Sequence, residues 1–557
     1  MKLATATATA TALPLSLHEA FSEACRRAPQ HAFLAESALS GGRSWTFAQA
    51  EAVVGELAAH YQRQGWGAGH RVALAVGNQP RHFFHFLALN RLGASIVPLN
   101  PDHRASEIRH ALTLARVDLV VAQPDRQAAI AEAVANSAAL QAIPLVAVES
   151  LQADLPRAPR PAALDDDVFE REAAILFTSG TSGLAKACRL TNRYVMTAGA
   201  WYRDLGGHLH LRPGQERLLN PLPVFHMNCG MSSIAAICLT DNCLVLPDRF
   251  HTSTWWEDCV RSGATAIHYL GIMPPALFQH APDEWESRHQ VRFGLGAGCD
   301  PGLHPAFEQR FGFPLVEVWG MTETGRFLTN QHDPRQTDTR AFGRAASPLE
   351  VRVVDDEDRD VAPGHPGEML VRATGSDPRL GFFSGYLDDE AATAQAWRGG
   401  WFHTGDVVTR DASGMLYFVD RRKDMIRRSG ENISSGEVEA ALSAHPSVHR
   451  VAVLSVPDEM RDEEVLAVIV LAAGVEASPE TAGELVRYCL RELSYYKAPG
   501  WILFRDDLPV TATNKLVKNR IFGAEQDRRA GALDCRYLKK RVAPSQPTPS
   551  NRPAQVN

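Results

Sequence analysis

The sequence has few of the features that mark disulfide-rich, metal-binding, nucleic-acid-binding or membrane proteins. Its nine cysteines are scattered through 557 residues without a Cys-x-x-Cys pair, which argues against a disulfide framework and against a zinc site. The net charge of −7 gives no reason to expect nucleic acid or an anionic membrane as a partner. No run approaches the ~20 apolar residues of a membrane span. We therefore expect a cytoplasmic protein with free cysteines and no integral membrane association.

The chain is longer than one hydrophobic core usually supports, so we expect two or more domains. Short apolar, β-rich runs at 71–78, 94–100 and 117–123 are separated by helical patterns such as 80–93, and this rhythm continues to about residue 420. Continuous apolar strands that alternate with helices are typical of a buried parallel sheet. Residues 16–420 are predicted to form a large, multi-layer α/β domain with helices on mixed sheets.

The pattern changes in the C-terminal part of the chain. Strand patterns at 449–458 and 463–472 are followed by a helical pattern at 478–493, which predicts a small α+β domain over residues 425–540. The Ala/Thr-rich residues 1–15 and the Pro/Ser-rich residues 541–557 have little apolar surface to bury. We expect a disordered leader and a disordered tail there.

The strongest local feature runs from Ile175 to Lys186. An apolar strand leads into a run of glycine and hydroxyl residues, and a lysine follows. Glycines let backbone N–H groups wrap an oxyanion, hydroxyls add donors and the lysine adds a positive charge, so the segment suits a triphosphate. It is not a Walker A loop, because Gly does not directly precede Lys186. Taken alone, the run is also compatible with a flexible surface turn.

Further motifs follow strands or turns later in the chain. In the segment 318–325, VWGMTETG, the aromatic residue could stack on a purine and Glu323 offers a hard oxygen ligand for Mg²⁺. Asp406 ends the motif GWFHTGD, and Arg421 belongs to the charged cluster DRRKD. Both could hold a ribose through charge-assisted hydrogen bonds. The last motif, PVTATNK, ends at Lys515.

Together these motifs resemble the adenylate-forming superfamily: acyl-CoA synthetases, peptide-synthetase adenylation domains and beetle luciferases. The resemblance covers about residues 20–525, and the segment 249–274 looks most like carnitine/crotonobetaine-type CoA ligases. It implies a large N-terminal domain, a hinge at 421–424 and a small mobile C-terminal domain. The implied reaction joins a small carboxylic acid to coenzyme A through an acyl-AMP, with ATP and Mg²⁺. A homodimer is one assembly that the family admits.

The resemblance also implies a role for each matching residue. Phosphate contacts fall to Thr178, Ser179, Gly180, Thr181, Ser182, Gly183 and Lys186. The adenine slot comprises Gly296, Ala297, Gly298 and Trp319, with Gly320 and Met321 beside it. Thr322 contacts the α-phosphate, Glu323 holds Mg²⁺, and Asp406 and Arg421 hold the ribose. His226 lies between acyl pocket and thiol tunnel, Lys423 is the hinge, Lys515 is the catalytic lysine, and Ser429, Gly430 and Glu431 line the tunnel.

Several residues have simpler interpretations. Lys515 and Arg326 could be solvated, His226 could be a core histidine, and Lys423 an ordinary linker residue. Ala185, Ala187, Asn192 and Asn514 depart from the family pattern, which leaves loop geometry and rate open. The polar residues Asn228, His268 and Asp300 favour a short, polar or aromatic acid. Two other functions stay open: loading a carrier-protein phosphopantetheine, and nucleotide binding without catalysis.

Overall fold

The computed structural model describes residues 13–539, apart from positions 102, 104, 136, 150, 152–154, 164–166, 179–184, 422–423, 429–430, 460, 494, 511–515 and 524–525. The predicted tail and most of the predicted leader lie outside the described residues. The chain divides into two compact units. The large unit comprises the chain up to Thr404 and Val408–Phe418, and the small unit comprises Gly405–Val407 and the chain from Val419 onward.

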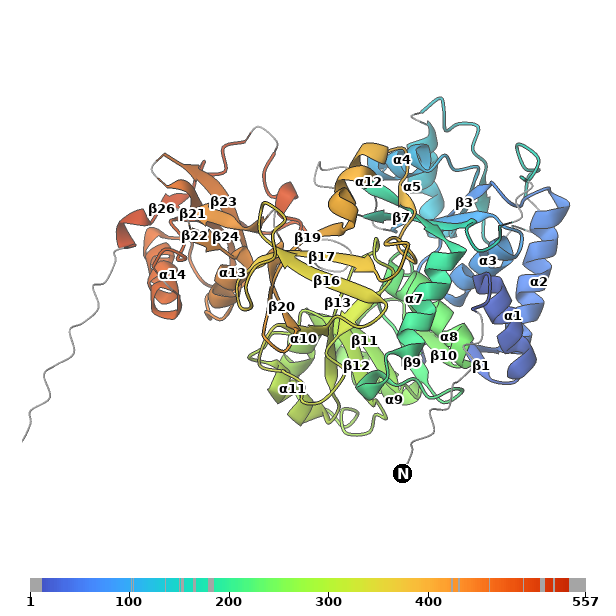
Figure 1. Ribbon diagram of the computed structural model, residues 1–557, viewed down its shortest axis with the longest axis horizontal. Coiled ribbons are helices and arrows are strands. Elements are labelled where there is room, and N and C mark those ends of the chain that lie inside the picture. Colours follow the sequence, from blue (N-terminus) through green and yellow to red (C-terminus); the bar gives the residue numbers. More distant parts are fainter. Residues whose placement is uncertain are drawn as a thin grey trace, which may run out of the picture. The chain divides into compact units, whose positions relative to one another are not determined.

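A seven-stranded sheet in the large unit carries the glycine- and hydroxyl-rich segment (Figure 1). Strands β3 to β7 pair in parallel, whereas β8 and β18 continue the sheet in antiparallel fashion. Most strand residues are buried, as the continuous apolar runs predict. In order across the sheet, the strands are β18 (Gly385–Tyr386), β8 (Lys186–Thr191), β7 (Glu172–Thr178), β4 (Ser95–Pro98), β3 (Arg71–Ala75), β5 (Leu119–Ala122) and β6 (Leu145–Ala147).

An eight-stranded sheet of the same unit has a parallel centre and an antiparallel strand at each edge. The strands are β14 (Phe327–Thr329), β13 (Leu315–Gly320), β12 (Phe293–Ala297), β11 (Ala266–Leu270), β9 (Arg217–Leu219), β10 (Cys243–Leu246), β1 (Ala32–Glu36) and β2 (Ser44–Thr46). A third sheet, five-stranded, was not predicted. Its strands are β15 (Ala341–Arg344), β20 (Met415–Arg421), β19 (Phe402–Arg410), β17 (Gly367–Ala373) and β16 (Leu349–Val354).

Amphipathic helices pack on these sheets and on each other; α7 lies against α8 in Figure 1. Local signals fix where they begin: Ser16 caps α1, Thr46 and Gln49 form a capping box on α2, and Thr191 caps α7. The α-helices described in the large unit are α1 (Leu17–Arg27), α2 (Phe47–Arg63), α3 (Pro80–Arg91), α4 (Ala105–Leu114), α5 (Pro124–Ala135), α7 (Asn192–Asp204), α8 (Ile234–Thr240), α9 (Trp255–Arg261), α10 (Met273–Gln279), α11 (His304–Phe311) and α12 (Glu390–Ala396).

The small unit is an α+β structure built on one mixed sheet. Its strands are β22 (Glu431–Ile433), β21 (Ile426–Arg428), β24 (Asp462–Leu471), β25 (Trp501–Phe504) and β26 (Leu533–Asp534), with β23 (Val448–Asp458) also paired to β24. Helix α13 (Ser435–Ser443) packs on β23 and on α14 (Pro479–Glu492). The predicted fold class, a large α/β part followed by a smaller α+β part, is confirmed.

Candidate active site

The glycine- and hydroxyl-rich segment joins two antiparallel neighbours, β7 and β8. Thr178, the last residue of β7, is paired with Lys186, the first residue of β8, so the chain reverses direction between them. Ser179, Gly180, Thr181, Ser182 and Gly183 follow Thr178 in the sequence and lie outside the described residues. Because β7 is parallel to β4, its last residue, Thr178, lies at the carboxyl edge of the parallel strands. That edge is where open α/β sheets bind their ligands.

Lys186 and Glu323 both contact one tyrosine, Tyr386. The Lys186 ammonium lies 4.6 Å from the centre of the Tyr386 ring, and the Tyr386 hydroxyl donates to Glu323 Oε1 over 2.9 Å. Glu323 is only 5% exposed. The structure therefore brings the predicted phosphate lysine and the predicted magnesium ligand into one cluster. We did not predict Tyr386 from the sequence. The sequence around it offers only an aromatic residue after a glycine, Gly385, and the two form the short strand β18.

Cys188 and Tyr194 are buried residues next to this cluster. Burial and the Glu323 charge raise the pKa of the Cys188 thiol well above its usual value, and Thr178 Oγ1 lies 3.8 Å from its sulfur. The Tyr194 hydroxyl donates to the carbonyl of Thr322 over 2.7 Å, and burial raises its pKa too. Both groups stay protonated, so Glu323 has neutral neighbours on this side.

Arg326 contradicts the prediction of a solvated side chain. It is 4% exposed, and its Nη1 donates to the carbonyl of Leu380 over 2.8 Å. Burial lowers its pKa to about 10. A Cβ at Gly381 would lie 2.6 Å from Nη2 of Arg326, so the glycine makes room for the guanidinium. Arg326 therefore fixes the segment before β18 against the 318–325 motif.

The predicted adenine-slot residues end two adjacent parallel strands. Gly296 of β12 is paired with Glu317 of β13, so the chain beyond Gly296 and the motif beyond Val318 leave the sheet side by side. A Cβ at Gly296 would lie 2.3 Å from the carbonyl oxygen of Tyr269, so no larger residue fits there. Gly298 adopts a positive φ of 86°. Ala297 is partly exposed and Trp319 is 6% exposed, with its ring 6.3 Å from that of Phe342.

The rest of the motif forms a tight turn. Gly320 is paired with Phe327 across β13 and β14, and Met321 is partly buried. The Thr324 hydroxyl lies 3.0 Å from the carbonyl of Met321 and 2.8 Å from that of Arg326. These contacts define the path of Thr322 and Glu323 between the two strands.

A buried histidine organises the predicted acyl-pocket segment. Asn228 Oδ1 lies 2.6 Å from His268 Nδ1 and can only accept, so Nδ1 carries the proton. The other ring nitrogen, Nε2, accepts from the Tyr202 hydroxyl over 2.8 Å. Burial lowers the pKa of His268 to about 3, so the ring is neutral. We predicted His268 and Asn228 as polar pocket residues, but not Tyr202, which comes from α7.

His226 is exposed, so its interpretation as a core histidine is wrong. Its carbonyl accepts from Gly230 N over 2.9 Å and its ring lies 4.7 Å from that of Phe225. Asn228 begins a π-helical turn, Asn228–Ser233. Such turns are rare and are often found at functional sites.

In the small unit, Asp406 and Arg421 are paired. Arg421 Nε lies 2.7 Å from Asp406 Oδ1, and the Asp406 side chain is only 1% exposed. Next to them, Asp420 Oδ2 accepts from the hydroxyls of Ser434 and Ser435 over 3.0 and 2.9 Å. This ties the end of β20 to the start of α13. The structure thus brings both predicted ribose ligands together.

The remaining predicted residues lie mostly outside the described part of the chain. This holds for Lys423, Ser429, Gly430 and Lys515. Glu431 opens β22, and its backbone pairs with that of Arg428. The segment with Lys515 is bounded by an antiparallel bridge between Val510 and Leu516.

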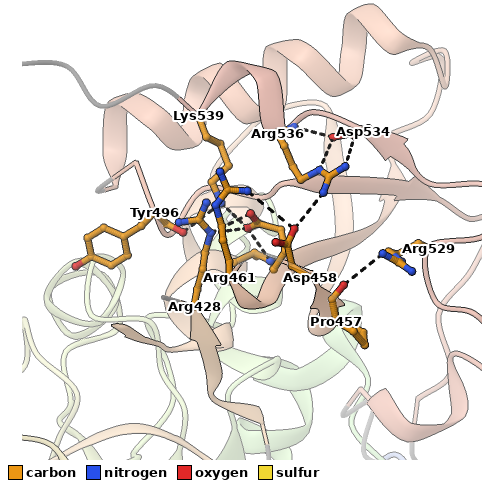
Figure 2. A network of polar contacts seen from close by, with 11 residues as sticks. Arg428, Pro457, Asp458, Arg461, Tyr496, Arg529, Asp534, Arg536 and Lys539 are labelled. Carbon is orange, nitrogen blue, oxygen red and sulfur yellow. Dashed lines mark hydrogen bonds and ion pairs between the residues drawn. The ribbon is translucent and has the colours of Figure 1, made fainter. Parts of the chain in front are cut away.

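A buried ionic network holds Lys539, the last described residue, to the rest of the small unit (Figure 2). Arg428 Nε donates to both Glu464 oxygens over 2.9 Å, and Lys539 Nζ donates to Glu464 Oε1 over 2.5 Å. The Glu464 side chain is fully buried and that of Lys539 is 1% exposed. Arg536 extends the network to Asp458 over 3.1 Å. Arg428 is the last residue of β21, which pairs with β22 as a hairpin, and it immediately precedes the predicted thiol-tunnel residues. The network therefore fixes the position of this end of β21.

Two family models match the chain. The model of AMP-binding enzymes matches residues 21–387, and that of the AMP-binding enzyme C-terminal domain matches residues 437–515. The chain belongs to the AMP-binding enzyme family. The predicted membership of the adenylate-forming superfamily is therefore confirmed. The first matched region contains the Lys186–Tyr386–Glu323 cluster, and the second ends at Lys515.

Named relatives cover most of the chain. A sulfoacetate–CoA ligase of Cupriavidus necator is 30% identical over 489 residues, 86% of this chain and 92% of the relative. A crotonobetaine/carnitine–CoA ligase of Salmonella paratyphi B is 29% identical over 501 residues, with 86% and 93% coverage. The solved o-succinylbenzoate coenzyme A synthetase of Bacillus subtilis, in complex with ATP and magnesium ion, has a TM-score of 0.76 and 24% identity, with 90% and 98% coverage. This last likeness shows the fold.

None of the helices in the described part of the chain is both long and apolar enough to cross a membrane.

Proposed function

We propose that the protein is an ATP-dependent acid–CoA ligase: a carboxylic acid and ATP give an acyl-AMP and pyrophosphate, and coenzyme A then gives the acyl-CoA and AMP. The observation that carries this proposal is the cluster of Lys186, Tyr386 and Glu323 at the point where β8 begins. A lysine and a carboxylate held on one tyrosine at the carboxyl edge of a sheet suit a nucleotide triphosphate and its cation.

Each side chain has a task in the first half-reaction. Lys186 and the turn amides would bind the β- and γ-phosphates and offset the charge of the leaving pyrophosphate. Glu323 offers a hard oxygen ligand of the kind that Mg²⁺ prefers, and Tyr386 would hold this carboxylate in place. Thr322 would contact the α-phosphate. When bound, Mg²⁺ would neutralise charge that develops on the phosphates. Lys515 would place its ammonium between the acid and the α-phosphorus.

The small unit would serve the nucleotide first and the thiol second. Asp406, which is paired with Arg421, would accept hydrogen bonds from the ribose hydroxyls. Lys515 must withdraw before a thiol can attack the acyl-AMP, and we propose that Lys423 is the pivot of this rotation. The hairpin that Arg428 anchors, with Ser429, Gly430 and Glu431, would then line the pantetheine tunnel.

For the substrate we propose a short, polar acid. Asn228 supports this, because it is partly exposed, is held by the buried His268, and presents an uncharged polar side chain. Two relatives are named for such acids, sulfoacetate and crotonobetaine or carnitine. A cytoplasmic location and a homodimer stay predictions.

A substrate screen tests the proposal. Purified protein, ATP and Mg²⁺ are mixed with sulfoacetate, carnitine, crotonobetaine, benzoate and short aliphatic acids, and pyrophosphate and AMP are measured with and without CoA. We expect pyrophosphate release with at least one acid and acyl-CoA only when CoA is present. Acyl transfer to a carrier protein but not to free CoA would favour the carrier-loading alternative. No ATP consumption with any acid, and equal inactivity of a Glu323→Gln control, would contradict the proposal.

A further inference from the structure

A cavity of about 410 Å³ lies at the amino edge of the seven-stranded sheet, where the parallel strands begin. Arg71, Ser95 and Glu172 line it, and each is the first residue of its strand, β3, β4 or β7. Thr178, at the other end of β7, is paired with Lys186. Because β7 has seven residues and a strand rises about 3.3 Å per residue, the two edges are about 20 Å apart. The cavity is therefore separate from the proposed phosphate site.

Guanidinium groups dominate the lining of this cavity. Two glutamates, Glu170 and Glu172, and five arginines contribute to it, so positive charge is in excess. A concave surface with an excess of one charge concentrates the electrostatic field and attracts ions of the opposite sign. The lining arginines are Arg71, Arg116, Arg160, Arg171 and Arg189.

The two glutamates do not neutralise these arginines. Both oxygens of Glu172 accept from Arg71, from Nε and Nη2, over 2.9 Å. Arg189 reaches the same carboxylate with Nε at 3.4 Å, and this is its one ion pair among the described residues. Its side chain is 47% exposed, so its Nη groups can donate to a ligand. Glu170 pairs with Arg193, which does not line the cavity.

Two other arginines are held by partners outside the lining. Arg116 donates from Nη2 to Asp388 over 2.7 Å, and its side chain is 69% exposed. Arg160 donates from Nη2 to Asp118 over 2.9 Å and to the carbonyl of Gly69 over 2.7 Å. These contacts fix where each guanidinium lies, and Arg116 keeps its Nε and Nη1 groups for a ligand.

The floor of the cavity contains an unpaired hydroxyl. Ser95 is 3% exposed, and its Oγ has no hydrogen-bond partner in the part of the chain that the structure describes. An unpaired buried hydroxyl is costly, and a ligand oxygen would supply the acceptor that it lacks. Beside it, a Cβ at Gly93 would lie 2.8 Å from Arg171 Nη1. Gly93 therefore lets this guanidinium lie against the backbone at the cavity.

We propose that this cavity binds an oligophosphate, either inorganic or as part of a nucleotide. Guanidinium groups match phosphate oxygens in geometry and bind them through charge-assisted, often paired, hydrogen bonds. Several arginines around one cavity balance a ligand with two or more negative charges, and no metal ion is needed to offset its charge. The site goes beyond the proposed ligase reaction and does not depend on it.

Modification of arginines tests the site in the full-length protein, without Mg²⁺ or acid. Butanedione modifies exposed guanidinium groups, and mass spectrometry reports each position. We expect pyrophosphate or ADP, at about ten times its Kd, to slow modification of Arg116 and Arg189 by about 10-fold. Arg249, whose side chain is 77% exposed and does not line the cavity, is the control and should not be protected. Protection at a lower concentration of pyrophosphate than of ADP identifies an inorganic oligophosphate as the ligand, and the reverse order identifies a nucleotide.

Titration calorimetry in a Lys186→Gln background separates the cavity from the proposed phosphate site at the opposite edge. Pyrophosphate should bind, and its affinity should fall as NaCl is added. A further Arg189→Gln change should weaken binding by about 10-fold, through loss of a charge-assisted hydrogen bond. Arg189→Lys, which keeps the charge but not the planar fork, should fall in between, and Arg249→Gln should have no effect.

Two results would overturn the proposal. One is that neither pyrophosphate nor ADP protects Arg116 and Arg189 from modification. The other is that Arg189→Gln and Arg249→Gln bind pyrophosphate equally tightly. Neither measurement uses turnover, so failure here is distinct from failure of the proposed ligase activity.

Discussion

Two groups of buried polar side chains differ in charge: the histidines His82, His85 and His268 of the large unit are neutral, whereas Arg428, Glu464 and Lys539 of the small unit form ion pairs. Burying a neutral imidazole costs less desolvation free energy than burying an ion, so a neutral histidine can line a ligand pocket without a counter-charge. Buried ions are stable only while each has its partner, so their geometry is strict. In the small unit, these ion pairs hold Lys539 and the last residue of β21, Arg428, in fixed positions (Figure 2).

The largest expected effect is on one half-reaction, the formation of the acyl-AMP, and comes from a residue of the small unit. Lys515→Ala removes the cation proposed for the acid and the α-phosphate, so pyrophosphate release should fall by at least about 100-fold. Pre-made acyl-AMP should still react with CoA. Both are measured with the acid found in the screen.

Lys497→Ala is the control, because Lys497 is a small-unit lysine paired with Glu437 and should change neither reaction. Equal loss of both half-reactions in Lys515→Ala would contradict the assignment of this residue.

Breaking the ionic network should be the largest effect on stability. Glu464→Gln leaves Arg428 and Lys539 buried without a counter-charge, which costs about 3–5 kcal/mol. Hydrogen exchange of the β24 amides, measured in the whole protein, should accelerate accordingly, while exchange in β12 stays unchanged. Glu463→Gln, at the neighbouring position, is the matched control. Unchanged β24 exchange in Glu464→Gln would show that the network does not stabilise the unit.

In the large unit, Tyr386→Phe should have a smaller, catalytic effect. It removes one hydrogen bond to a charged group, worth about 1.5–3 kcal/mol, but keeps the ring beneath Lys186. We expect kcat/KM for pyrophosphate release to fall by about 10–100-fold and the Mg²⁺ requirement to rise. Tyr417→Phe removes a hydroxyl that bonds Gln336 and Asp411 instead, and serves as the control. Equal kinetics of the two variants would exclude a role for Tyr386 in holding Glu323.

The smallest effect concerns pH. The pKa of His268 is about 3 in the folded protein and its usual value is 6.5. Below pH 6.5 the unfolded chain takes up a proton at His268 that the folded chain does not take up. The contribution of His268 to the free energy of unfolding is therefore fully present above pH 6.5 and is lost as the pH falls toward 3. At pH 5 the free energy of unfolding is lower by about 2 kcal/mol than at pH 7 for this reason. The melting temperature of His268→Gln should depend less on pH between 6.5 and 5 than that of the unmodified protein; parallel curves would refute this.

Much of the site could be predicted because its chemistry needs particular residue types in order along the chain. A strand that ends in glycines and hydroxyls before Lys186, and Glu323 after a second strand, predict a phosphate site without knowledge of the fold. Helix starts at Ser16 and Thr46 could be predicted for the same reason, since capping depends on neighbours within four residues.

Other residues gained their roles only from contacts across the fold. Tyr386 reaches Glu323 because the short strand β18 pairs with β8, and Arg326 is buried because Leu380 and Gly381 receive it. No pattern of neighbouring residues in the sequence predicts such contacts between distant parts of the chain. The sequence by itself determined the reaction class and the order of the elements, because both follow from residue types along the chain. Only the tertiary structure decided which buried polar groups are paired, because desolvation and hydrogen bonding depend on neighbours that the chain brings together from far apart.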